Sequence, residues 1–297
     1  MSFDVLCCGM LCADLAFRVA RQPGADEKMQ AEALLLCGGG PAANAAVQVA
    51  RLGGRAAFLG RVGRDGLGAQ LRAELESERV DVRGLLDVGE ATAAAAQLIK
   101  PDGARSVVAY RRPPTAVPRP REPRATDAAV LLVDGHEPAW SEALVAEARA
   151  AGHATLLDAG SLNAGTRMLA HQVDHVVASE AFARAWLGTD PTPDGLVAIG
   201  RREATVVVTL GARGLWWRRG GESGTVPAFR VDVVDTTGAG DAFHGAYALG
   251  LARRLAWRDL LREASAAGAL ACARFGARPA LATCAELEAF LGTTGPD

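Results

Sequence analysis

Short apolar runs of strand length recur along the chain and alternate with longer segments of helical character. The apolar runs are Val5–Met10, Ala56–Leu59, Val130–Val133, Thr155–Leu157, His175–Ala178 and Thr205–Leu210. The segments between most of them are rich in Ala, Leu, Glu and Arg: Pro41–Leu52, Leu67–Ser77, Ser141–Ala151 and Asp194–Arg202. This alternation predicts an α/β fold with a mainly parallel, buried sheet. The last part of the chain is predicted to be helical, over Ala239–Arg253, Trp257–Arg274 and Cys284–Leu291.

Two segments, Met29–Cys37 and Ala91–Tyr110, break the alternation and look rich in β-structure. The second contains a turn signal at Pro101-Asp102-Gly103 between two strand-like runs. Because no helical segment lies between them to cover a face, we expect a small separate sheet that acts as a lid or an interface. The stretch Pro113–Pro120 is rich in proline and is interpreted as a stiff linker back to the main body.

Composition and charge exclude several classes of protein. Hydrophobic residues make up 49% and charged residues 22% of the 297 residues, which is ordinary for a soluble globular protein. A formal net charge of −2 argues against a nucleic-acid binder, which usually carries a basic face. No apolar run approaches the roughly 20 residues of a membrane span, and the first residues lack the features of a secretory signal. We therefore expect a cytoplasmic location, with neither nucleic acid nor membrane as a partner.

The six cysteines show no C-x-x-C spacing of a zinc or redox site. Cys7, Cys8 and Cys12 fall in or just after an apparent buried strand and are interpreted as reduced core thiols. A metal cluster built from Cys7, Cys12 and Cys37 is the less favoured alternative, because its spacing is wrong for a structural metal site.

The strongest chemical signal is the string Val231–Gly245, in which an apolar strand is predicted to lead into a small-residue turn and then a helix. Gly238, Ala239 and Gly240 leave backbone N–H groups exposed at the helix start, where the helix dipole also favours an anion. Phosphoryl transfer needs such stabilisation, because charge spreads over the equatorial oxygens of the moving group. Asp241, in the first helical turn, would face this anion site and accept a hydroxyl proton.

A plain turn followed by a first-turn acid is the alternative interpretation of this string. It is disfavoured because the flanking Asp235-Thr236-Thr237 and Phe243-x-Gly245 make a long composite match.

Two further signals lie near the start of the chain. In Cys37–Ala46, a glycine run opens a helix, and Gly39 and Gly40 would let a polyol approach the backbone while Asn44 bonds its hydroxyls. The run lacks the G-x-G-x-x-G spacing of a dinucleotide loop, which makes an NAD-binding protein unlikely. Asp14 follows the first strand and would accept two sugar hydroxyls. Alone, the glycine run would be interpreted as a tight turn, and Asp14 as an exposed loop aspartate.

Together, and in this order, the three segments resemble the ribokinase/fructokinase (phosphofructokinase-B type) family of carbohydrate kinases, nearly end to end. Further matches are Arg51–Gly54, Leu59–Gly68 and Val207–Gly214. The resemblance implies a ribokinase-like three-layer sandwich with a central mainly parallel sheet. It implies one domain over residues 1–297 with small β lid segments inserted at about 12–37 and 86–112.

The resemblance also implies roles for individual residues. Asp241 would be the general base, with Gly238, Ala239 and Gly240 as the anion hole. The acceptor would be held by Asp14, Gly39, Gly40 and Asn44, with Lys28 and Tyr110 on the lid. The nucleotide, ATP with Mg²⁺, would lie by Thr209, Gly211, Gly214, Ala273, Gly276 and Ala277. Asp235 and Thr237 match positions that help to bind a monovalent cation such as K⁺. Where many relatives carry Asn-x-x-Glu near Mg²⁺, this chain has Ser179–Phe182, so either Glu180 or water takes that role.

In its motifs the chain is nearest to the sulfofructose-kinase and fructokinase branches of the family. Lys28 would suit an anionic substituent on the acceptor, but Ala109 and His136 stand where sulfofructose kinases have polar and basic residues. Arg111 and Arg112 would replace that charge or, as favoured here, form a solvated pair. A neutral or acidic ketose is therefore the broader expectation, and a homodimer through the lid is expected. The alternatives are a nucleoside kinase of the same family and a non-catalytic sugar- or nucleotide-binding sensor.

Overall fold

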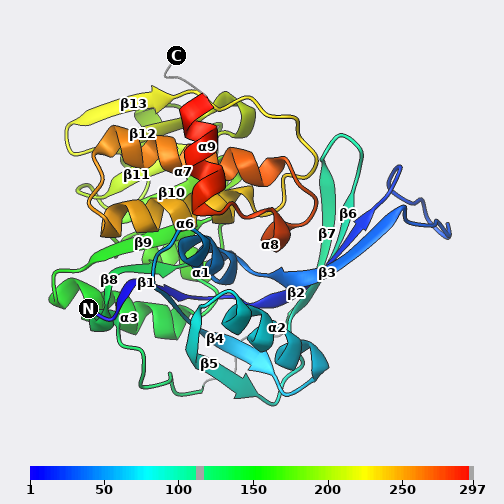
Figure 1. Cartoon of the computed structure of the whole chain (residues 1–297). Helices are drawn as coiled ribbons and strands as arrows, with labels where there is room; N and C mark the ends of the chain where they lie inside the picture. Colours follow the sequence, from blue (N-terminus) through cyan, green and yellow to red (C-terminus); the bar gives the residue numbers. More distant parts are fainter. Residues whose placement is uncertain (112–116, 294–297) are drawn as a thin grey trace.

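The computed structural model describes residues 1–111 and 117–293 and contains two sheets (Figure 1). In spatial order the large sheet contains β13 (Glu222–Val226), β12 (Leu215–Arg219), β11 (Thr205–Thr209), β10 (His175–Ser179), β9 (Ala154–Ala159), β8 (Ala128–Val133), β1 (Phe3–Cys8), β4 (Ala56–Gly63) and β5 (Asp81–Val88). Its strands are parallel from β5 to β11, and β12 and β13 add antiparallel strands at one edge. The predicted α/β class with a mainly parallel sheet is confirmed.

Helices cover both faces of the large sheet. Alternate side chains of β1 enter different cores: Val5 and Cys7 pack with one group of helices, Leu6 and Cys8 with the other. The helices on the first face are α1 (Pro41–Arg51), α2 (Gly66–Ser77), α6 (Ala239–Ala252), α7 (Trp257–Cys272) and α9 (Cys284–Thr293). Those on the second are α3 (Pro138–Ala150), α4 (Ala164–Leu169) and α5 (Glu180–Leu187). A short helix, α8 (Ala277–Ala280), follows α7, and the 3₁₀ turns are Ala125–Asp127, Asp194–Ala198 and Gly211–Arg213.

The small sheet projects from one side of the body (Figure 1). Its strands, in spatial order, are β3 (Ala33–Gly39), β2 (Cys12–Arg18), β6 (Ala94–Ile99) and β7 (Arg105–Tyr110). The predicted turn at Pro101–Gly103 joins β6 to β7. The tip of this hairpin meets the segment before α6, because Thr236 Oγ1 donates a hydrogen bond to the Gly103 carbonyl at 3.4 Å.

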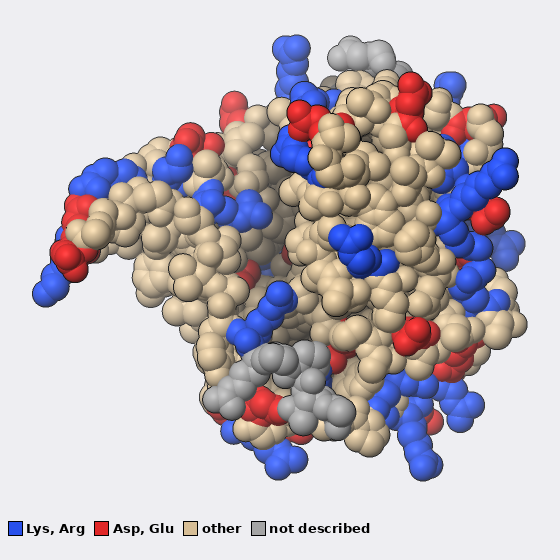
Figure 2. Space-filling view, turned by 180° about the vertical axis from the view of Figure 1, so that it is seen from behind, with Lys and Arg blue, Asp and Glu red and all other residues tan. Residues whose placement is uncertain are grey.

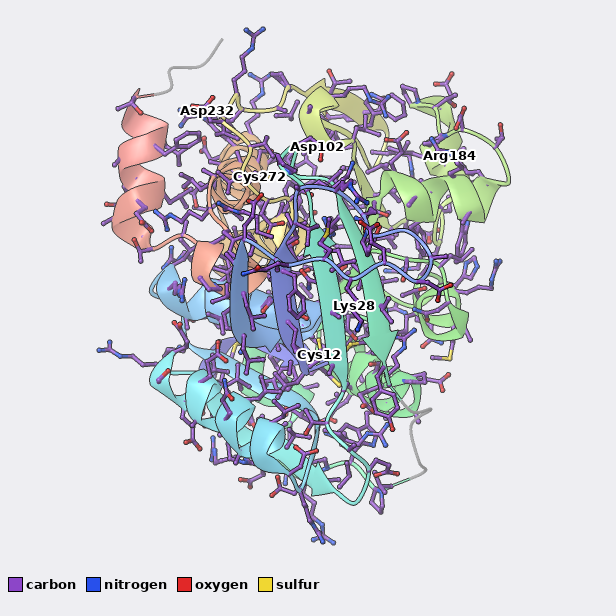
Figure 3. All side chains as sticks on the ribbon, turned by 90° about the vertical axis from the view of Figure 1, so that its right-hand side faces the viewer. Cys12, Lys28, Asp102, Arg184, Asp232 and Cys272 are labelled. Carbon is purple, nitrogen blue, oxygen red and sulfur yellow. The ribbon has the colours of Figure 1, made fainter. Side chains whose placement is uncertain are left out.

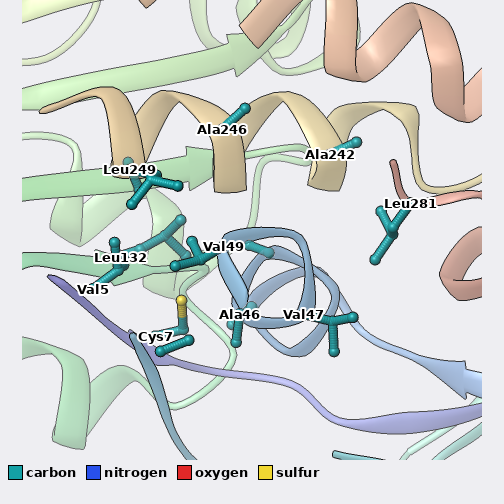
Figure 4. Close-up of a cluster of buried hydrophobic side chains, with 14 of the residues drawn as sticks. Val5, Cys7, Ala46, Val47, Val49, Leu132, Ala242, Ala246, Leu249 and Leu281 are labelled. Carbon is teal, nitrogen blue, oxygen red and sulfur yellow. The ribbon is translucent and has the colours of Figure 1, made fainter. Parts of the chain in front are cut away.

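The contact between α1 and α6 positions the residues that follow. Figure 4 shows Ala46 and Val49 of α1 between β1 and α6, beside Val5, Cys7 and Leu249. A side chain at Gly245 of α6 would collide with the Ala45 carbonyl of α1, so the two helix backbones approach closely. This close approach brings the N-terminal halves of α1 and α6 together at the carboxyl ends of the strands.

Two predicted elements are wrong. Val231–Val234 forms no strand: the Val234 N–H bonds the Cys272 carbonyl at the end of α7, at 2.8 Å, instead of a neighbouring strand. Asp194–Arg202 forms only a 3₁₀ turn over Asp194–Ala198, and the backbone then turns at Gly200, whose φ is 72°.

Three other outcomes concern cysteines, helices and the linker. Cys7, Cys8 and Cys12 are free and buried, as predicted. Among the described helices, none has the length and apolarity of a membrane-spanning segment. Arg112 and the first part of the predicted linker Pro113–Pro120 lie outside the described residues.

Candidate active site

A glycine turn starts α6 and opens onto a cavity. Gly238 is the residue before the helix and has a φ of 79°, in the left-handed region that favours glycine. A side chain there would lie 3.0 Å from Ala277, whereas one at Gly240 would meet nothing within 4 Å. The first turn of α6 thus presents its N–H groups and the positive end of its dipole to open space.

The cavity beside this turn has a volume of about 540 Å³. It lies at the carboxyl ends of β9, β10 and β11, where ligands bind in open α/β sheets. Figure 2 shows the hollow between the projecting small sheet and the body of the molecule. Of the predicted residues, Thr209, Gly211, Gly238, Gly240 and Asp241 line the cavity.

Asp241 joins the glycine turn of α6 to the glycine run before α1. Its Oδ2 accepts a hydrogen bond from Asn44 Nδ2 at 2.7 Å, and Asn44 Oδ1 accepts one from Arg278 Nε at 3.2 Å. The buried Arg278 therefore fixes which end of the Asn44 amide faces Asp241. Burial raises the pKa of Asp241, while the Asn44 hydrogen bond and the nearby His244 and Arg105 lower it.

Asp14 lies on β2, on the side of the small sheet that faces Asp241. Its carboxylate packs against Gly39, where any side chain would collide with it. The Cys12 thiol donates a hydrogen bond to Asp14 Oδ1 at 3.5 Å. Burial raises the pKa of Asp14 to about 6, and the charge of Asp241 adds to this effect. Asp14, Gly39, Asn44 and Asp241 thus form one continuous polar surface.

A second cavity, of about 400 Å³, lies at the carboxyl ends of β1, β4 and β8. In its wall Arg61 holds Glu137 through two hydrogen bonds, at 2.9 and 2.6 Å. Arg111 Nη1 donates to His136 Nδ1 at 2.7 Å, and Arg111 is exposed at the edge of this cavity.

Four predicted residues lie apart from these surfaces. Lys28 is exposed in the connection between β2 and β3, which Figure 3 shows running across the small sheet. Tyr110 ends β7 and is 47% exposed. Gly214 is the turn residue before β12, with a φ of 85°, and Ala273 is exposed after α7. Among the described residues that line either cavity, none of these four is found.

The carboxylate of Asp235 ties the glycine turn to the segment before α8. Its Oδ1 accepts hydrogen bonds from the Thr237 N–H at 2.9 Å and hydroxyl at 2.6 Å, and its Oδ2 accepts one from the Gly276 N–H at 2.9 Å. Asp235 and Gly276 thus support the glycine turn from behind. A monovalent cation at Asp235 and Thr237 stays a prediction, which the dependence of the rate on K⁺ would check.

Glu180 starts α5 and lines the cavity, but two arginines hold its carboxylate. Arg184 Nη2 donates to it at 3.1 Å and Arg213 Nη2 at 2.5 Å. Figure 3 shows Arg184 on α5. No cluster of three His, Cys, Asp or Glu side chains able to hold a metal occurs among the described residues. The Glu180 carboxylate is therefore paired with arginines in this structure, and a role for Glu180 or water in holding Mg²⁺ stays a prediction.

Among the residues that line the cavity, Arg105 on β7, Asp158 on β9 and His244 on α6 were not singled out as site residues from the sequence. Asp158 lies in a Gly- and Asp-rich strand end, the place where ligand-binding residues are expected. His244 stands within the string around Asp241. Arg105 has no local signal, because only the folding of the hairpin brings it to the cavity.

Comparison with known proteins identifies the family. The sequence model of the pfkB family carbohydrate kinases matches residues 2–284 of this chain. The chain belongs to the pfkB family of carbohydrate kinases. Fructokinase-1 of Oryza sativa is 32% identical to this pfkB kinase over 294 residues, covering 87% of this chain and 89% of the relative. The ribokinase of Haemophilus influenzae is 27% identical over 265 residues, covering 85% of this chain and 87% of the relative.

Solved structures agree with this family assignment. A protein from Agrobacterium tumefaciens that has been assigned as a ribokinase superposes on the pfkB kinase with a TM-score of 0.90 at 30% identity, covering 99% of this chain and 98% of that one. The Arabidopsis thaliana ribokinase complexed with ribose and ATP has the same fold, with a TM-score of 0.81 at 23% identity and coverage of 98% and 99%. The predicted family and the ribokinase-like fold are thus confirmed.

Proposed function

We propose that this pfkB kinase transfers the γ-phosphoryl group of ATP to a hydroxyl of a ketose such as fructose, or of an acid-substituted sugar. The observation that carries the proposal is the hydrogen bond of 2.7 Å between Asn44 and Asp241. It places a residue suited to binding sugar hydroxyls against a carboxylate that lines the cavity beside the glycine turn. An acceptor hydroxyl between Asp14 and Asp241 would then lie next to a phosphoryl group at the start of α6.

In this mechanism Asp14, Gly39 and Asn44 bind the sugar and orient one hydroxyl toward Asp241. Asp241 accepts the hydroxyl proton as the hydroxyl oxygen attacks the γ-phosphorus, and ADP leaves. The N–H groups of the turn at Gly238–Gly240 stabilise the charge of the transferred group. Mg²⁺ would enter with ATP as part of that substrate and neutralise phosphate charge.

The acceptor side of the site suits a sugar better than a nucleoside. Its surface is made of carboxylate, amide and glycine backbone, and the second cavity is bordered by the Arg61–Glu137 and Arg111–His136 pairs. Arg111 adds a cation at the edge of this cavity, which keeps acid-substituted sugars within the proposed class.

Asp241→Asn tests the proposal directly. ADP release with MgATP is measured against ketoses, aldoses, sugar acids, sulfosugars and nucleosides, first with the native enzyme. For the best sugar we expect kcat to fall by about 10²–10⁴-fold in the variant, the range for a positioned general base. Asp259→Asn is the matched control, because Asp259 is also the third residue of its helix but is exposed on α7. If Asp241→Asn keeps the native rate, Asp241 is not the base. If the native protein binds ATP but phosphorylates no sugar, the result favours the non-catalytic sensor.

A further inference from the structure

His244 lies one helical turn after Asp241 and is buried, with only 4% of its surface exposed. Its Nδ1 is 2.6 Å from the carbonyl oxygen of Gly240, and its Nε2 is 3.1 Å from the carbonyl oxygen of Val177 on β10. A carbonyl oxygen has no hydrogen to give, so each ring nitrogen must be the donor. Only the doubly protonated imidazolium has two N–H groups, so this geometry points to a positive charge on His244.

The counterion of this charge is Asp158, at the carboxyl end of β9. Its Oδ2 lies 3.4 Å from His244 Nδ1, and the two side chains are 4% and 5% exposed. This oxygen has no hydrogen-bond partner within the described part of the chain. A buried carboxylate oxygen without a hydrogen-bond partner is costly, and a neighbouring cation offsets that cost.

We propose that His244 is a positioning residue for phosphoryl transfer: a charged imidazolium that holds the Gly240 carbonyl beneath the glycine turn and offsets the negative charge of Asp158 and Asp241. The inference rests on the proposed function in one respect, the role of Asp241 as base. ATP brings several more negative charges into the cavity. A fixed cation behind the turn reduces their repulsion by the two carboxylates.

The charges around His244 set the sign of the expected effect. They come from Asp158 on β9, Asp134 after β8, Asp241 on α6 and Arg105 on β7, with Glu180 and Arg184 of α5 lining the same cavity. Burial raises the pKa of Asp158 to about 7 and also raises the pKa of Asp241, while His244 lowers both. Loss of the imidazolium would therefore raise the pKa of Asp241 further, and the base would be neutralised at a higher pH.

The charge state can be measured without any assay of activity. In protein labelled with ¹⁵N-histidine, the ring signals of His244 are identified by their loss in His244→Gln. We expect both nitrogens to show the protonated signature at the pH of the kinetic assays. His175 is the internal control, because burial lowers its pKa to about 4 and its Nδ1 faces the Tyr247 hydroxyl at 2.9 Å. A neutral His244 ring at this pH overturns the proposal.

The kinetic consequence is measured with the sugar that reacts best. In the pH profile of kcat/KM, we expect His244→Gln to raise the pH at which the value falls on the acidic side by about one pH unit or more. A shift of this size is the effect of losing an opposite charge within a few ångströms. The KM for MgATP should rise at least several-fold. His175 is a half-buried histidine that contacts α6, and His175→Gln should leave both quantities unchanged. If the acidic limb of His244→Gln coincides with that of the native enzyme, the electrostatic role is wrong.

A failure of the proposed function and a failure of the inference on His244 can be told apart. An active Asp241→Asn variant would contradict the proposed base, while the NMR signals would still decide whether His244 is charged. A neutral His244 would contradict this inference and leave the proposed phosphoryl transfer to sugar untouched.

Discussion

Asp14, one of the proposed sugar-binding residues, changes its charge near neutral pH. Burial raises its pKa to about 6. Only the ionised carboxylate accepts two charge-assisted hydrogen bonds from sugar hydroxyls, and this form is lost as the pH falls through that value. We therefore predict that the KM for the sugar rises below about pH 6, while the KM for MgATP changes less. Initial rates over a grid of sugar concentration and pH measure both constants.

Asp14→Asn is the control for this prediction, because asparagine keeps the shape but does not titrate. Its sugar KM should be high at every pH and lack the rise below pH 6 seen in the native enzyme. A native sugar KM that stays flat across this range would show that Asp14 does not hold the acceptor.

At the scale of single residues, the sequence is most informative where function depends on a local motif. The glycine turn, Asp241 and Asn44 each stand in such a motif, and the structure places them together. Arg278 was not foreseen, because it reaches Asn44 from 234 residues away. Its short helix contains nothing that marks it as a buried cation.

Among the elements, the β6–β7 hairpin has the most direct link to the cavity. Arg105 at the start of β7 donates a hydrogen bond to Thr236 Oγ1 at 2.8 Å and lines the cavity. A hairpin that acts as a lid would thereby carry a cation to the phosphates when it closes. We predict that Arg105→Gln lowers kcat by about 10²–10³-fold, as does the loss of one charge-stabilising donor in other active sites.

Steady-state kinetics of Arg105→Gln, with Lys100→Gln as the control, checks this prediction. Lys100 lies on the same hairpin but pairs with Asp102 at the surface. Equal rates for the two variants would show that the cation of Arg105 has no part in the reaction.

The elements that were predicted correctly are the central strands with continuous apolar runs and the longer helices, such as those near Pro41–Arg51 and Ala239–Ala252. Strands β5, β12 and β13 were not predicted from the sequence. They lie at or near the edges of the sheet and are less buried than the central strands, so their sequences lack a continuous apolar run. Val231–Val234 has strand-like composition, yet the end of α7 takes its hydrogen bond. That competition depends on the tertiary fold and leaves no trace in the local pattern.

At the scale of the whole molecule, we predict self-association through the face of the small sheet opposite Asp14. Pairing in register places Leu36, Leu34, Val108 and Tyr110 on the side opposite Asp14, where they are 41%, 61%, 74% and 47% exposed. Exposed apolar faces and open sheet edges are sites of association. We propose that a second copy of this chain covers this face, and we predict a dimer by light scattering at micromolar concentration.

Val108→Lys should shift this equilibrium toward the monomer, because it places a charge in the apolar face. Val197→Lys is the matched control: Val197 is 60% exposed on the 3₁₀ turn Asp194–Ala198, away from the small sheet. A native protein that is monomeric, or a dimer unaffected by Val108→Lys, would contradict the predicted interface.

The hydrogen bond between Asn44 and Asp241 joins residues 197 positions apart, and this has a consequence for protein synthesis. At about 5–20 residues per second, a ribosome makes Asn44 roughly 10–40 s before Asp241. During that time the residues that line the cavity are still being added, and neither the glycine turn nor Asp241 has been made. If Asp241 is the base, an unfinished copy lacks the group that accepts the hydroxyl proton until the last helices have been made.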